Sequence, residues 1–153
     1  MKNSILSLLL ASVLLSCDND DPAVTIDLQA EKIEFSVVPT SEFAGVATIT
    51  GTVKNIGSNY ASGSNQQLVN LYENSTLVKS IPFQNLNAGE SIQISYSRAW
   101  NSSSPAEGEF PPDYRLEIAY DPDILIDGNP NNDDKNSSNN SKTESGRAIN
   151  ELF

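Results

Sequence analysis

Apolar and polar residues alternate cleanly along Val46–Gly57. One side of this segment is small or apolar and consists of Ala47, Ile49, Gly51 and Val53. The other side is polar and consists of Thr48, Thr50, Thr52 and Lys54. A period of two predicts a β-strand with one dry face and one wet face. Asn55, Ile56 and Gly57 then provide the residue types of a turn.

The same kind of pattern recurs along the chain at roughly even spacing. We expect further strands at Val24–Val38 (with a kink near residue 29, and ended by Pro39), Gln67–Asn74, Leu77–Phe83, Ser91–Trp100 and Tyr114–Tyr120. The segments Thr40–Gly45, Ser58–Asn65 and Asn101–Pro112 are rich in turn-forming residues and are expected to be loops.

Six short strands without a convincing helix predict an all-β protein, an immunoglobulin-like antiparallel β-sandwich of about seven strands. Tyr114, near the start of the sixth strand, is a candidate tyrosine corner whose hydroxyl would reach back to the backbone. Leu86 is expected in the core. The seventh strand is the least defined element, because the residues that follow the sixth are mostly polar.

Composition excludes several kinds of chemistry. The 153 residues include no histidine and one cysteine, so Ser-His-Asp and Cys-His catalysis and His-based or multi-Cys zinc sites cannot form within one chain. Nine Lys and Arg against 20 Asp and Glu give a formal net charge of −11. A field of that sign repels phosphate, so we expect no nucleic-acid partner.

The first residues have the layout of a secretory signal, with Lys2 followed by the apolar run Ile5–Leu15. Leu14-Leu15-Ser16-Cys17 resembles the lipobox of bacterial lipoproteins, which implies that Cys17 is the lipidated first residue of the mature chain. A plain secretory signal with an incidental cysteine is the alternative. Residues 17–24 would be an acidic tether, which resembles the export tags of surface lipoproteins and equally fits a solvated linker.

Between Asp27 and about Asn140 the chain resembles the CARDB family, the cell-adhesion-related domains of bacteria. The matching motifs are Val53-Lys54-Asn55-Ile56-Gly57, Leu71-Tyr72-Glu73-Asn74, Leu86-Asn87-Ala88-Gly89-Glu90-Ser91, Trp100 and Asp121-Pro122-Asp123. The resemblance implies an immunoglobulin-like binding or spacer module on secreted or surface proteins, with no catalytic residues to transfer.

The family usually passes through an Asn-Asn pair into its last strand, and here the pair is either Asn131-Asn132 or Asn139-Asn140. With the second pair, Ser141–Ser145 would be a short edge strand, and Ile149, Leu152 and Phe153 would form a small apolar cap. The expected organisation is a signal peptide at 1–16, the tether at 17–24, the CARDB-like domain at 25–145 and a short cap or tail at 146–153.

Carboxylate and amide side chains crowd into the segment after the sixth strand. Calcium binds six to eight oxygen ligands, and this segment offers Asp121, Asp123, Asp127, Asn129, Asn131 and Asp133 as candidates. The spacing is not that of an EF-hand, because Asn132 and Ser138 replace the required Gly and Glu. A solvated turn rich in Asn and Asp is the alternative.

Three aromatic residues are candidate ligand contacts for a sugar or a peptide: Tyr60, Trp100 and Phe110. For Trp100, packing at the edge of the core is the competing interpretation. Glu107, Glu109 and Asp113 are a remote candidate for acid–base catalysis, because no pattern fixes their separation.

The sequence therefore favours a lipid-anchored, extracytoplasmic, non-catalytic module for binding or adhesion, on the outer membrane and either at the cell surface or in the periplasm. Its partners would be the membrane, through the lipid on Cys17, and a protein or glycan. A structural accessory subunit of an envelope complex is the alternative function, and a hydrolase that uses acidic residues is the remote one.

Overall fold

The computed structural model describes residues 25–63 and 66–153. The predicted signal peptide and tether, including Cys17, lie outside these residues. Within the described ranges, no helix has the length and apolarity needed to cross a bilayer.

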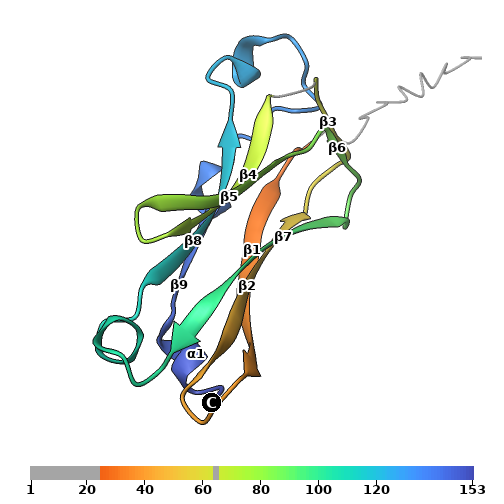
Figure 1. The fold of residues 1–153 in the computed structure, drawn as a ribbon. Coiled ribbons are helices and arrows are strands. Elements are labelled where there is room, and N and C mark those ends of the chain that lie inside the picture. Colours follow the sequence, from red (N-terminus) through yellow and green to blue (C-terminus); the bar gives the residue numbers. More distant parts are fainter. Residues whose placement is uncertain (1–24, 64–65) are drawn as a thin grey trace, which may run out of the picture.

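Two antiparallel sheets face each other across one core (Figure 1). The first sheet has the order β1-β2-β7, with β1 at Leu28–Pro39, β2 at Ala44–Asn55 and β7 at Ser91–Asn101. The second has the order β5-β4-β8-β9, formed by β5 (Thr76–Pro82), β4 (Gln67–Glu73), β8 (Asp113–Tyr120) and β9 (Ser141–Ser145). The short strands β3 (Tyr60–Ala61) and β6 (Asn85–Leu86) pair at one end. The predicted β-sandwich is thus confirmed.

The helical elements are short. A single π-helical turn spans Pro105–Glu109, 3-10 turns span Ile124–Ile126 and Ser137–Asn139, and α1 spans Arg147–Asn150. Ser104 caps the π-helical turn, since its side chain accepts a hydrogen bond from the Glu107 N–H at 3.1 Å.

The alternation predicted for β2 is largely confirmed. Ala47, Ile49 and Val53 are buried in the core. Gly51 packs directly against the second sheet, because a Cβ atom there would come within 2.6 Å of Leu116 Cδ1. Thr52 differs from the prediction: it belongs to the polar face but is only 3% exposed.

The predicted kink in the first strand is a β-bulge, since the register of β1 with β2 shifts between Ala30 and Lys32. The seventh strand is β9 at Ser141–Ser145, so Asn139-Asn140 is the pair that precedes it. Ile149, in α1, is fully buried. Phe153 packs against the core, whereas Leu152 is 47% exposed and does not complete the predicted cap.

Tyr114 is buried as expected, but its hydroxyl does not reach the backbone. The hydroxyl donates instead to the carboxylate of Glu73 at 3.3 Å. The prediction that it bonds to the backbone, as in a tyrosine corner, is therefore wrong. Leu86 is buried in the core, as predicted.

Candidate functional site

The segment that follows β8 does not gather its acidic side chains around a common point. Asp127 accepts hydrogen bonds from the side-chain amides of Asn132 at 2.9 Å and Gln66 at 3.0 Å, and from the Asn129 N–H at 2.7 Å. The bond from Asn132, followed by those from Asn129 and Gln66, lowers the pKa of Asp127. The Asp121 carboxylate accepts a hydrogen bond from the Asp123 N–H at 3.0 Å, and this bond stabilises a local turn.

Asn129 and Asp133 have side-chain partners outside any common cluster, and Asn131 is held through its backbone. Asn129 donates its side-chain amide to the Ala61 carbonyl at 2.9 Å, and the Asn131 carbonyl accepts from the Ala61 N–H at 2.9 Å. Asp133, whose side chain is 20% exposed, forms an ion pair with the exposed Lys135 at 3.7 Å. Over residues 25–63 and 66–153, no three His, Cys, Asp or Glu side chains form a group that could hold a metal. The structure therefore does not bring the six predicted ligands together.

Asp134 lies next to the predicted calcium ligands but was not one of them, and its side chain is buried. Its carboxylate accepts from the Tyr120 hydroxyl at 2.8 Å, the Asn136 N–H at 3.1 Å and the Leu28 N–H at 3.4 Å. Burial raises the pKa of Asp134, although these hydrogen bonds act in the opposite direction. Asp134 thus fastens the loop to the start of β1, which is a structural role.

The three candidate aromatic residues have different environments. Tyr60 is only 1% exposed and donates its hydroxyl to Gln67 Oε1 at 2.8 Å. Trp100 is 2% exposed and donates its indole N–H to Asn150 Oδ1 at 2.8 Å. Both side chains are buried, so the structure places both residues in the core, and Trp100 also lines the pocket described below. Phe110 is 75% exposed and is the one of the three that is accessible.

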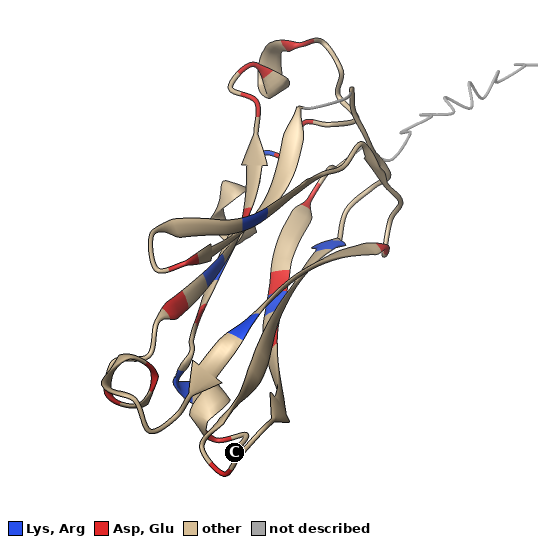
Figure 2. Cartoon of the chain, in the orientation of Figure 1, with Lys and Arg blue, Asp and Glu red and all other residues tan. Residues whose placement is uncertain are grey.

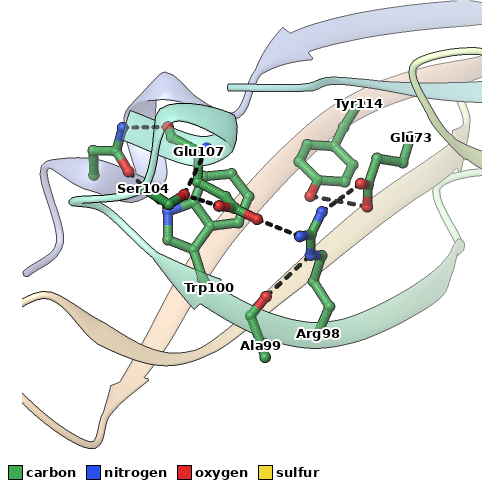
Figure 3. Close-up of polar contacts among 8 residues, drawn as sticks. Glu73, Arg98, Ala99, Trp100, Ser104, Glu107 and Tyr114 are labelled. Carbon is green, nitrogen blue, oxygen red and sulfur yellow. Dashed lines mark hydrogen bonds and ion pairs between the residues drawn. The ribbon is translucent and has the colours of Figure 1, made fainter. Parts of the chain in front are cut away.

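Arg98 is the centre of a polar network between the two sheets (Figure 3). Its guanidinium forms ion pairs with Glu73, at the end of β4, and with Glu107, in the π-helical turn. Tyr114 donates to the same Glu73 carboxylate, and burial followed by the charge of Glu73 raises the pKa of this tyrosine. The guanidinium also lies 5.5 Å from the centre of the Trp100 ring.

This network fixes the loop Asn101–Pro112 to the body of the sandwich. Asn150 donates its side-chain amide to the Glu107 carbonyl at 2.8 Å, which adds α1 to the same cluster. Glu107 was one of the three acids considered for catalysis. Because its carboxylate is bound by Arg98 and Ser104, it is not poised as a general acid or base.

An open, shallow pocket of about 420 Å³ lies beside this network. It is lined by residues of the β1–β2 turn, the end of β7 and the π-helical turn: Thr40, Ala44, Gly45, Arg98, Ala99, Trp100, Asn101 and Glu107. Three exposed apolar residues lie at the tip of the neighbouring hairpin, namely Val38 (69% exposed), Phe43 (50%) and Val46 (42%). We call these three residues the hairpin-tip patch. Val38 and Val46 are a cross-strand pair.

The three residues of the hairpin-tip patch are uncharged, and Glu42, exposed in the same turn, is acidic. Figure 2 shows acidic residues at this end of the sandwich as well as in the loop after β8 and on the π-helical turn. Apolar side chains on an exposed tip next to a pocket can contact a partner without a large desolvation cost. This end of the molecule is therefore the candidate functional site.

Comparison with known proteins identifies a matching family and several similar solved structures. A family model for CARDB matches residues 25–144. The solution structure of a CARDB domain from Pyrococcus furiosus is 21% identical, with a TM-score of 0.45 over 80% of this chain and 94% of that one. A crystal structure of that domain, described as a complex with di-metal ions, has a TM-score of 0.45 at 21% identity, over 79% of this chain and 86% of that one.

A domain from Methanosarcina acetivorans, whose description proposes a cell surface protein, is 21% identical and has a TM-score of 0.46 over 79% of this chain and 90% of that one. No curated protein matches the chain.

Proposed function

This chain belongs to the CARDB family, and from that premise we propose that it is a non-catalytic module, held on the bacterial envelope by a lipid on Cys17, that binds a protein or glycan through the hairpin end of its sandwich. The observation that carries the proposal is the placement of the hairpin-tip patch. It lies at the end of the molecule opposite to the start of β1, where the described chain begins (Figure 1).

This polarity suits a tethered binding module. A chain anchored near its N-terminus holds the start of β1 near the membrane and directs the β1–β2 hairpin away from it. Exposed apolar residues at such a tip meet a partner rather than the lipid surface. The shallow pocket beside the tip provides a concave surface within the same contact area.

The polar clusters of the described residues support a binding role rather than a catalytic one. The Arg98 network pairs a guanidinium with two carboxylates and holds a loop in place. Asp134 is enclosed by donors from Tyr120, Asn136 and Leu28. In both clusters the charged group forms ion pairs or hydrogen bonds with neighbouring residues of the fold. Acid–base catalysis needs a group that can exchange protons with a substrate.

The lipid anchor rests on the sequence around Cys17, the only cysteine in the chain, which follows an apolar run. Phase partitioning of the protein from its native cells tests it. The wild-type protein is expected in the detergent phase and a Cys17→Ser variant in the aqueous phase, because the variant has no acyl chains. Equal partitioning of the two proteins would contradict the anchor. Protease treatment of intact cells then tells surface exposure from a periplasmic location.

The contact surface can be tested with two matched photo-crosslinking positions. Phe43, in the hairpin-tip patch, and Ile56, near the start of β1, are both 50% exposed. A photoreactive amino acid at position 43 is expected to give a discrete crosslinked product on cells, and the same residue at position 56 is expected to give none. Crosslinking from position 56 alone, or from neither position, would refute the hairpin end as the contact surface.

A further inference from the structure

The outer edge of β7 lacks the features that normally keep one sheet edge from pairing with another. Unpaired backbone N–H and C=O groups on an edge strand attract a further strand, and proteins prevent this with short strands, bulges, prolines or charges. β7 is 11 residues long, and its pairing with β2 continues without a register shift from Ser91 to Asn101. Within the part of the chain that the structure describes, no strand pairs with its other side.

The other three edges of the two sheets are protected. β1 is interrupted by a bulge beside Lys32 and ends at Pro39. β5 has seven residues and ends at Pro82. β9 has only five residues, of which Lys142 and Glu144 are charged. Of these four edge strands, β7 has the fewest features that oppose pairing with another strand.

The side chains of β7 favour such pairing. Its only charged residue is Arg98, near the end of the strand, whose guanidinium pairs with Glu73 and Glu107 and whose Nε donates to the Ala99 carbonyl at 3.1 Å, so the segment from Ser91 to Ser97 carries no charge. Ile92 and Tyr96 pack against the core but remain partly exposed beside the free edge. A neighbouring strand with apolar residues at alternate positions would cover them. The outward face of β7 is uncharged, with small side chains except for Gln93, and consists of Ser91, Gln93, Ser95, Ser97 and Ala99.

We propose that this edge pairs antiparallel with the same edge of a second copy of the chain, so that two first sheets become one continuous sheet. β7 is complementary to itself. With Ile94 opposite Ile94 of the second copy on the two-fold axis, Ile92 lies opposite Tyr96. Apolar residues then meet apolar residues on both sides of the axis, and no like charges face each other between Ser91 and Ser97.

An antiparallel pair has a consequence for a tethered protein. The two copies point in opposite directions, so their β1 strands begin at opposite ends of the dimer. Two anchored copies would therefore belong to two facing membrane surfaces, and their pairing would be adhesive. This consequence rests on the proposed anchor, whereas the pairing itself does not.

Sedimentation velocity on the chain from residue 17 onward, carrying Cys17→Ser, tests the pairing without any lipid. A dimer is expected to form with rising protein concentration. The dimer should be favoured by salt, because the acidic residues, which outnumber the basic ones 20 to 9 in the full chain, make the two copies repel each other, and the screening length shortens from about 10 Å at 0.1 M to about 3 Å at 1 M. A protein that remains monomeric at every concentration and salt level overturns the proposal and leaves the proposed anchor and contact surface untouched.

Ser97 and Ser36 provide matched variants. Both are exposed and both pair with Thr48 in one cross-strand row, but Ser97 lies on β7 and Ser36 on β1. Ser97→Lys is expected to weaken the dimer about tenfold or more, because a charge on the edge opposes pairing, and Ser36→Lys is expected to leave it unchanged. Equal effects from the two variants overturn the proposal. Ser95→Lys serves as the second β7 variant if Ser97→Lys does not retain the wild-type circular dichroism spectrum.

Discussion

Replacing Arg98 by methionine measures how much the charge network contributes to the stability of the sandwich. Methionine keeps most of the apolar stem of the side chain and removes the guanidinium. The side chains of Arg98, Glu73 and Glu107 are 25%, 18% and 13% exposed, so the substitution leaves two carboxylates largely shielded from water and without their cation.

The magnitude follows from that partial burial. Breaking a fully buried ion pair costs about 3–5 kcal/mol, whereas a fully exposed pair contributes about 0–1 kcal/mol. With exposed fractions of 13–25%, the free energy of the network should be closer to the value for a buried ion pair, reduced somewhat because solvent screens the charges. We expect Arg98→Met to lower the free energy of unfolding by about 2–3 kcal/mol.

Urea unfolding, followed by circular dichroism on the chain from residue 17 onward with Cys17→Ser, gives the measurement. The matched control is Lys32→Met, because Lys32 and Glu34 form an ion pair whose side chains are 45% and 56% exposed. Its expected cost is much smaller than that of Arg98→Met, because solvent screens an exposed ion pair. If Arg98→Met costs no more than Lys32→Met, the network does not stabilise the fold. Adding Glu107→Gln to Arg98→Met should recover part of the loss, because one unpaired carboxylate is removed.

Three further predictions concern single groups. Tyr60→Phe should lower the free energy of unfolding by about 1–3 kcal/mol, because the buried Gln67 oxygen loses its donor; an unchanged urea midpoint would contradict this. Burial makes the folded state hold the Asp134 proton more tightly, so the unfolding free energy of the wild type should fall as the pH rises from the ordinary carboxyl pKa of 3.8 through the raised pKa of the folded state. Urea titrations of Asp134→Asn at several pH values should lack this slope, and an identical slope would show that another group causes it. The melting temperature should be the same in calcium and in chelator, since the predicted ligands are not brought together, and a calcium-dependent rise would contradict the structure.

The sequence alone determined the order of the six long strands along the chain and their dry faces, but not the burial of Thr52 or the short strands β3 and β6. Alternation along Val46–Gly57 depends only on the two-residue period of an extended backbone, so it identifies the buried Ala47, Ile49 and Val53 without any knowledge of their partners. The edge strand Ser141–Ser145 was one of two alternatives that the family resemblance offered, and the structure selects it; periodicity could not, because its own residues are polar.

The sites were decided by the tertiary structure. Tyr60 stands in a polar stretch of sequence and looks accessible, but pairing of β3 with β6 brings it beneath the end of the sandwich, where it is 1% exposed. Asp134 looks like one more acid in a solvated run, but it accepts from Leu28, 106 positions earlier in the chain. Local patterns report which face of a strand is dry. The partner of a polar group depends on which distant segments the folded sandwich brings together. The local sequence around that group does not contain this information.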